Sequence, residues 1–327
     1  MMGNFGDILQ NATTLGLIYG LMAIGLFISY RILDVADLTV DSSFTLGAAT
    51  SAIFTINGKP LLGVIMAILA GMCAGLVTAF LQTKLKINPI LAGILTMTGL
   101  YSINLWVMKK TPNLSLMRLK TIFTPLENLV GKKLAYFLIS LFLVALVSVL
   151  ILLFFKTHIG LAIRATGDNE DMVRSSSVNV DVMKMIALAL ANGIVALSGA
   201  TLAQYQHSAD IGMGTGIVIM GLASLVIGEV VVGRKHLAQN LIAVVVGSIL
   251  YRIIFALVME LGISASDIKL MSAIIMILSI SYPVIVQKVK YLRQKQLAKK
   301  IDITNICCSG EGGNGKYVGS DSNNQNI

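Results

Sequence analysis

The sequence has little charge and few of the residue patterns that build catalytic or metal sites. Only 13% of its 327 residues are charged, against roughly a quarter in an average soluble domain. Three histidines and three cysteines show no metal-ligand spacing. The sequence has no His-Glu-x-x-His, no Ser/Lys dyad in a recognisable context and no paired Gly-x-Gly-Asp aspartates. These absences argue against a metal site and leave an intramembrane enzyme as the weakest hypothesis.

Long apolar runs take the place of charge. Hydrophobic residues make up 56% of the chain, and its mean hydropathy is +0.83. A helix needs about 20 apolar residues to cross a hydrocarbon core of about 30 Å. The runs are Thr13 to Tyr30, Ser42 to Gly58, Pro60 to Thr83, Ile87 to Met108, Leu134 to Phe155, Met185 to Gln206, Ile211 to Gly228, Leu237 to Tyr251 and Leu270 to Gln287. They predict an all-α polytopic membrane protein with about nine transmembrane helices.

The distribution of Lys and Arg predicts the orientation. With the N-terminus outside and nine spans, the cytoplasmic segments hold 16 of these residues and the outer segments 8, as the positive-inside rule requires. The outer loop from Lys109 to Lys133 is itself basic and opposes this assignment. A segment from Thr121 to Val130 that dips into the membrane without crossing is the alternative to be weighed there. The first ten residues carry no Lys or Arg, so we expect no cleaved signal peptide.

The composition divides the chain into two parts. Residues 1–290 are expected to form the transmembrane permease domain. Residues 291–327 are first basic and then rich in Gly, Asn and Ser, which predicts a disordered cytoplasmic tail. The tail segment GEGGNGKY lacks the Ser or Thr that follows Lys in a nucleotide-binding P-loop.

One polar segment, Thr157 to Lys184, interrupts the apolar runs. Gly167-Asp168-Asn169 is a turn and helix N-cap signal. The acidic Glu170 and Asp171 suit the positive end of the following helix, EDMVRSSS, and Arg174 suits its last turn. The composition alone also allows a solvated loop with a local helix.

A second unusual stretch, DVADLTVDSSFTLGAA, places three aspartates among apolar residues. Asp34 is expected to pair with Arg31 at the membrane edge, and Asp41 to cap the second span. A carboxylate within the membrane costs at least ~2.5 kcal/mol unless it lines a cavity or faces water. The candidates for a solute pathway in this stretch are therefore Asp37, Thr39, Ser43 and Thr45.

The segment SADIGMGTGIVIMGLAS echoes that stretch. Each has Ala-Asp followed by a Gly, with Gly47 coming 10 residues after Asp37 and Gly221 11 residues after Asp210. With nine spans the two copies have opposite topology, which predicts an inverted-repeat core with broken helices at the substrate site. Asp210 and Thr215 join the pathway candidates. Because Ala-Asp is a common pair, a chance match is the alternative.

Three blocks carry a resemblance to a known family. GLAIRATGDNEDMVRSSSVNVDVMK followed by MIALALANGIVALSGATLA resembles a segment of permeases of bacterial ATP-binding-cassette (ABC) importers of the branched-chain amino acid and ribose type. The opening block and IGEVVVGRK are similar to the corresponding blocks of that family. Within the opening block, DLTVDSSFTLGAA is similar to the subgroup associated with tryptophan or tyrosine uptake. Ser177 departs from the pattern, because the family usually has Gly there.

The resemblance implies a fold, partners and roles. The fold would be like that of a type II ABC importer permease, and Thr157 to Lys184 would be a coupling segment that docks on a separate ABC ATPase subunit. The chain itself would bind no cofactor, since ATP and Mg would lie in that ATPase. The other partners would be an extracellular substrate-binding (lipo)protein, a second permease subunit and the lipid bilayer, without nucleic acid. The implied ATPase-facing or helix-orienting residues are Arg164, Asn169, Glu170, Asp171, Met172 and Arg174.

The sequence thus predicts a transport subunit and not an enzyme. It would lie as a multi-pass protein in the bacterial cytoplasmic membrane and move a small solute inward, an amino acid and, more narrowly, an aromatic one. A secondary transporter that uses Asp37 and Asp210 as ion or proton sites is the alternative.

Overall fold

The computed structural model describes residues 2–233 and 236–260, together with residues 270, 273, 274, 277 and 281. Nearly all of them belong to one compact unit, Met1–Ser279. The expected tail at residues 291–327 and most of the ninth apolar run lie outside the described residues.

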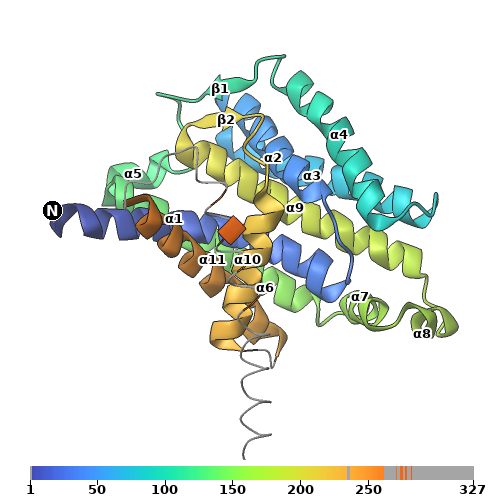
Figure 1. The fold of residues 1–327 in the computed structure, drawn as a ribbon. Coiled ribbons are helices and arrows are strands. Elements are labelled where there is room, and N and C mark those ends of the chain that lie inside the picture. Colours follow the sequence, from blue (N-terminus) through green and yellow to red (C-terminus); the bar gives the residue numbers. More distant parts are fainter. Residues whose placement is uncertain are drawn as a thin grey trace, which may run out of the picture. The chain divides into compact units, whose positions relative to one another are not determined.

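The described chain is a bundle of helices with one small sheet (Figure 1). A π-helix, η1, continues the first helix directly. The elements are α1 (Met2–Leu26), η1 (Phe27–Ile32), α2 (Thr39–Ile56), α3 (Pro60–Thr83), α4 (Pro89–Val107), β1 (Asn113–Ser115), α5 (Thr124–Val130), α6 (Lys132–Phe154), α7 (His158–Asp168), α8 (Glu170–Ser175), α9 (Val180–Gln206), β2 (Ser208–Asp210), α10 (Ile217–Val232) and α11 (Leu237–Glu260).

Six of the described helices are long and apolar enough to cross a membrane: α1 with η1, α3, α4, α6, α9 and α11. Two more of the predicted runs are helices that do not qualify. α2 carries Asp41 and several hydroxyls, and α10 is short. The polytopic helical class is confirmed, while the count of nine spans is not.

The apolar run from Ile211 to Gly228 is helical only in its later part. Residues 211–216 form turns, and α10 begins only at Ile217. Gly216 precedes the helix with a φ of 80°, a conformation that glycine adopts without steric cost. The glycine-rich sequence therefore delays the start of the helix by six residues, from Ile211 to Ile217.

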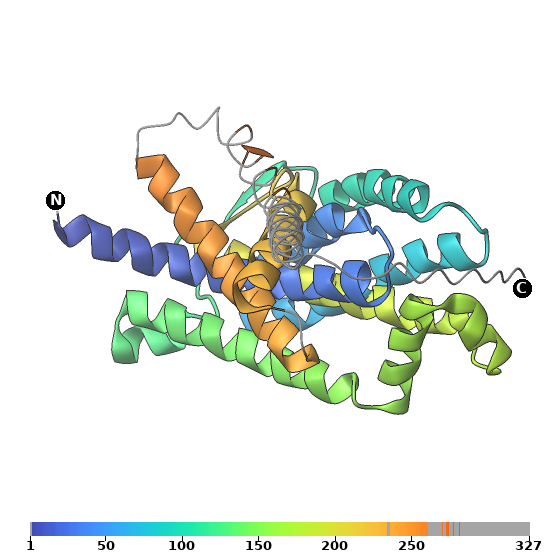
Figure 2. The same ribbon diagram turned by 60° about the horizontal axis from the view of Figure 1, so that its bottom comes forward.

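The centre of the bundle is built from two long helices. The apolar windows of α1 with η1 and of α9 are each 83% buried, compared with 22% for α6 and 28% for α4. Both views show α9 running past α1 with α4 farther out, and Figure 2 shows α6 along one edge (Figures 1 and 2). The peripheral helices expose apolar side chains such as Leu150 and Trp106, as helices facing lipid do.

Small residues let the central helices approach closely. Gly16 and Gly20 of α1 lie against Ile249 and Ser248 of α11, and the Ser248 hydroxyl donates to the Gly16 carbonyl at 2.7 Å. In the same way, Gly71 and Gly75 of α3 lie against the α9 backbone. The Gly-xxx-Gly spacings of the sequence therefore serve helix packing.

The connections at the two ends of the bundle differ in kind. The basic loop between α4 and α6 holds β1, which pairs antiparallel with β2, and α5, which at 7 residues is too short to cross a membrane. At the other end, α7 and α8 form a helical hairpin before α9. Both views place this hairpin far from the N-terminus of α1 (Figures 1 and 2).

Candidate functional site

The first helix break separates η1 from α2 and buries a carboxylate. Asp34 has a φ of 55°, and the chain stays non-helical until Thr39. Asp37 is only 2% exposed. Its Oδ1 accepts from the Thr39 N–H at 2.9 Å, and its Oδ2 accepts from Nδ2 of Asn192, on α9, at 2.7 Å. Because a buried carboxylate needs donors to replace water, these bonds hold the start of α2 against the middle of α9.

The second break separates α9 from α10. His207 ends α9 in the left-handed conformation with a φ of 53°, and β2 follows directly. Gly216 then precedes α10. The second break is thus longer than the first, but it likewise places a new helix start inside the bundle.

Asp41 joins the two breaks. Its Oδ2 accepts from the Gly216 N–H at 3.0 Å, and its Oδ1 accepts from the Val218 N–H at 2.9 Å. One turn along α2, the Thr45 hydroxyl oxygen accepts from the Gly214 N–H at 3.1 Å. The prediction that Asp41 caps its own helix is wrong, since α2 has no side-chain cap and Asp41 instead caps α10. The first amides of a helix lack partners and carry its positive dipole end, and both facts favour a carboxylate there.

Similar packing recurs around the two breaks. Gly47 of α2 lies against Ala196 of α9, and Gly221 of α10 lies against Met22 and Leu26 of α1. Likewise, α3 packs on α9 and α11 packs on α1. The order α1, break, α2, α3 thus corresponds to α9, break, α10, α11, in which each short helix rests on the long helix of the other repeat.

The other expected pathway residues on α2 are also buried. The Thr39 hydroxyl lies 2.8 Å from that of Thr78 on α3. Ser43 is fully buried, and its hydroxyl has no hydrogen-bond partner within the described part of the chain. The first turns of α2 after Asp37 therefore carry polar side chains that are buried and not accessible to solvent.

The remaining two expected pathway residues lie apart from Asp37. Asp210 belongs to β2, where its Oδ1 accepts from the Gly212 N–H at 2.7 Å. Thr215 is exposed in the turns before α10. In the described structure Asp37 and Asp210 share no hydrogen-bond partner. The similar stretches of sequence therefore do not bring the two carboxylates together in one site. The described residues also hold no cluster of His, Cys, Asp or Glu that could bind a metal ion.

The polar segment before α9 folds as a capped helical hairpin. Thr157 caps α7 through the Gly160 N–H at 3.3 Å, and Asn169 caps α8 through the Met172 N–H at 3.0 Å. The local signals thus placed the start of α8 correctly, although α7 was not foreseen. Its signal is the buried stripe of Gly160, Ile163 and Thr166, spaced three residues apart.

The expected ATPase-facing residues lie on both helices of the hairpin. Asp171, Met172 and Arg174 are exposed on α8, and the Met172 side chain reaches 69% exposure, whereas Val173 is buried. Arg164 is exposed on α7. Methionine and arginine are enriched at protein interfaces, and Met172 and Arg174 are both exposed on α8.

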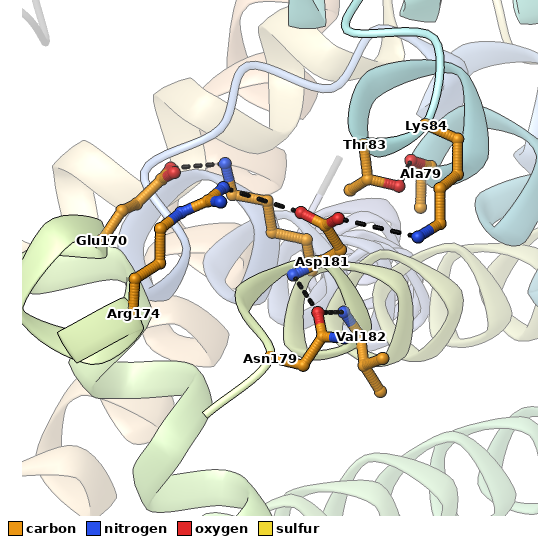
Figure 3. Close-up of polar contacts among 9 residues, drawn as sticks. Ala79, Thr83, Lys84, Glu170, Arg174, Asn179, Asp181 and Val182 are labelled. Atoms are coloured by element: carbon orange, nitrogen blue, oxygen red, sulfur yellow. Dashed lines mark hydrogen bonds and ion pairs between the residues drawn. The ribbon is translucent and has the colours of Figure 1, made fainter. Parts of the chain in front are cut away.

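Ion pairs fix α8 to the base of the bundle (Figure 3). Glu170 pairs with Lys184 of α9. Arg174 Nη2 lies 3.6 Å from Asp181 Oδ1, and Lys84 Nζ, just after α3, lies 3.8 Å from Asp181 Oδ2. The charged network therefore links α8 to the ends of α3 and α9, while Ile163 of α7 packs in the apolar core of the bundle.

The end of α7 touches the first break. A Cβ placed on Gly167 would collide with the Ile32 carbonyl and approach Leu33. Beside this contact is a polar cleft of about 650 Å³, lined in part by Arg164 and Arg31. Arg31 Nε lies 3.2 Å from Glu229 Oε1 of α10. The expected Arg31–Asp34 pair is therefore wrong, because Arg31 instead links the end of η1 to the end of α10.

Ser177, the residue that departs from the family pattern, adopts a φ of 60°. A left-handed conformation costs a non-glycine residue roughly 1–2 kcal/mol. We expect Ser177→Gly to raise the free energy of unfolding by up to about 1 kcal/mol, because the glycine gain is partly offset by the entropy of the unfolded chain. Thermal unfolding in detergent measures this. Ser175→Gly, within α8, should lower stability instead, and an equal response of both variants would contradict the assignment.

Comparison with known proteins places this architecture in a family. Residues 8–280 match the family model described as branched-chain amino acid transport system, permease component. The chain is 37% identical to a tyrosine transport system permease protein of Clostridioides difficile, over 81% of this chain and 87% of the relative. It is 33% identical to an uncharacterized protein of Rickettsia prowazekii, over 84% and 97% of the two chains.

A more distant relative is a ribose import permease protein of Escherichia coli, 24% identical over 85% of each chain. No solved structure matched the chain. The match extends from α1 past α11 and so includes both helix breaks and the α7–α8 hairpin. The chain therefore belongs to the branched-chain amino acid and ribose-type family of ABC importer permeases, and it is a multi-pass protein of the bacterial inner membrane.

Proposed function

We propose that this permease component imports an amino acid by alternating access, driven by ATP hydrolysis in a separate ATPase subunit. The observation that carries the proposal is the α7–α8 hairpin. It exposes Met172 and Asp171 at one end of the bundle, while Gly167 touches the helix break that leads to Asp37. A partner that moves α8 would thereby move the start of α2.

The remaining parts of the proposal follow from the family. ATP and Mg would be held by the ATPase, and an extracellular binding protein would deliver the solute to the opposite face. A second permease subunit, a copy of this chain or a close paralogue, would complete the pathway. A tyrosine transport system permease among the relatives supports an aromatic amino acid as the solute.

Reconstitution tests the proposal against a secondary transporter. The chain is co-expressed with the ATPase and binding protein that co-purify with it and placed in proteoliposomes. We expect uptake of L-tyrosine to require ATP and the binding protein and to survive ionophores that collapse ion gradients. Uptake that follows an ion gradient without the ATPase would overturn the proposal and favour the Asp37 and Asp210 hypothesis.

The ion pair between Glu170 and Lys184 provides a test of the hairpin's role. Both side chains are partly exposed, at 43% and 18%, so breaking the pair should cost less than about 1 kcal/mol of stability. We nevertheless expect Glu170→Lys or Lys184→Glu to lower solute-stimulated ATP hydrolysis several-fold, because α8 loses its fixed position. The double exchange should restore hydrolysis.

A matched pair at the far end of the bundle controls for charge alone. Lys133 Nζ lies 2.6 Å from Asp7 Oδ1, and both side chains are half-exposed. Exchanging these two residues should leave hydrolysis unchanged. If the Glu170 and Lys184 variants also hydrolyse ATP normally, the hairpin does not couple the subunits.

A further inference from the structure

Arg252 places a cation inside a membrane-spanning helix. It lies in α11, one turn beyond Ser248, whose hydroxyl bonds to Gly16 in the middle of α1. Glu260 ends the helix two turns later. A charge at this depth is costly, and such residues mark ion or substrate pathways when no other partner explains them.

The partners of Arg252 in the described structure are aromatic rings. Its Cζ lies 3.6 Å from the centroid of the Tyr19 ring and 5.7 Å from that of Phe255. None of the ion pairs among the described residues includes Arg252, and none of their side-chain hydrogen bonds does. A guanidinium above a ring is attracted by the ring face, and this attraction does not use its N–H groups as hydrogen-bond donors to an oxyanion.

The ring beneath Arg252 belongs to the junction of the two repeats. Tyr19 stacks on Phe44 of α2, with centroids 6.1 Å apart and planes within 12°. Both rings belong to the apolar cluster that includes Ile217 and Val218, the first residues of α10. The neighbouring Tyr251 packs on Ala223 of α10. The ring beneath Arg252 thus packs in the cluster that holds the start of α10, and an inverted-repeat transporter places its solute at such helix starts.

We propose that Arg252 is a carboxylate-binding residue of the solute pathway, with Tyr19 as the platform that holds its guanidinium. The planar edge of a guanidinium matches a carboxylate with two parallel hydrogen bonds, and the adjacent, partly exposed ring of Phe255 suits an aromatic side chain. The ligand class is an amino acid with a free carboxylate. This inference rests on the proposed import function and assigns the part of the solute that the membrane subunit recognises.

The test measures ATP-dependent L-tyrosine uptake in proteoliposomes made of neutral lipid. We expect R252Q to raise KM at least roughly 10-fold and to leave kcat within about 2-fold of the wild-type value, because binding is lost and the switching machinery is not touched. R252K keeps the positive charge but loses the planar pair of N–H donors, and it should also raise KM roughly 10-fold. A wild-type KM in R252K overturns the proposal even where R252Q fails to assemble.

A variant of the platform and a matched tyrosine variant separate carboxylate binding from a general effect of losing a ring. Tyr19→Leu removes the ring face beneath Arg252 and should raise KM as R252K does, whereas Tyr101→Leu removes an exposed ring on α4 and should leave KM unchanged. Equal KM values for Tyr19→Leu and wild type would overturn the proposal that the Tyr19 ring positions Arg252. If wild-type vesicles show no ATP-dependent uptake at all, the proposed function itself fails, and this outcome is distinct from a variant that transports normally.

An anionic lipid headgroup is the other source of an oxyanion for Arg252. Repeating the uptake assay with phosphatidylglycerol vesicles distinguishes the two. Competition from lipid would raise the wild-type KM and leave that of R252Q unchanged, which would show that the guanidinium serves the bilayer and overturn the assignment to the solute. Equal wild-type KM values in both lipids support it.

Discussion

Asp41→Ala is expected to abolish transport and to destabilise the protein by about 3 kcal/mol or more, since a hydrogen bond to a charged group is worth about 1.5–3 kcal/mol and two are lost. The carboxylate accepts from the amides of Gly216 and Val218, and nothing in alanine replaces it. Both amides belong to the buried or half-buried start of α10. The loss therefore separates the two repeats at the point where their short helices meet.

Two neighbouring variants give this prediction its controls. Asp41→Asn keeps one oxygen acceptor and should lie between wild type and Asp41→Ala. Ser42→Ala removes a hydroxyl that donates to the Met97 carbonyl of α4 at 2.9 Å, so it breaks a bond of the same helix outside the repeat junction. Thermal unfolding and L-tyrosine uptake are the measurements. Similar losses for Ser42→Ala and Asp41→Ala would show that the junction has no special role.

Gly167→Val is expected to uncouple ATP hydrolysis from uptake. The added side chain would collide with the Ile32 carbonyl, which cannot move without shifting the first break. The hairpin would be displaced from η1, although its exposed surface on α8 would remain unchanged. We therefore expect the ATPase subunit to stay bound and to hydrolyse ATP, while uptake per ATP falls at least roughly 10-fold, as misplacement by about 1 Å can cost 10²-fold in activity.

Gly99→Val is the matched control for that prediction. Gly99 lies within α4, and a Cβ there would meet nothing within 4 Å. Uptake and hydrolysis should both stay near wild-type values. Coupled transport by Gly167→Val would show that the contact between α7 and η1 transmits no motion.

The sequence predicted what depends on near neighbours along the chain. Apolar runs located the long helices, and the Asn169 cap with its following acids located α8. The partners of Asp41 could not be found in this way, because Gly216 and Val218 lie 175 and 177 residues away. The same distance effect hid the pairing of Arg31 with Glu229. Reasoning from the sequence pairs a charged side chain with the nearest suitable group along the chain. In the fold its partner is a group far away in the sequence.

The candidate site was foreseen in part for the same reason. The two echoing stretches fall at the two helix breaks, and the inverted topology of the repeat stays a prediction. Their similarity did not predict that Asp37 is held by Asn192 while Asp210 lies in a strand. A repeat conserves helix order and packing, but the loops between its helices can differ in length. Their polar residues therefore need not be equivalent.

The glycine contacts between α1 and α11 and between α3 and α9 bear on how the protein is made. Each pair joins a helix synthesised early to one synthesised late. Until α9 and α11 leave the ribosome, the faces around Gly16 and Gly71 have no helix against which to pack. Membrane insertion must therefore precede assembly, and a chain that stops before α11 would leave the Gly16 face of α1 unpacked. Truncated chains should accordingly be substrates for membrane proteases rather than partly working transporters.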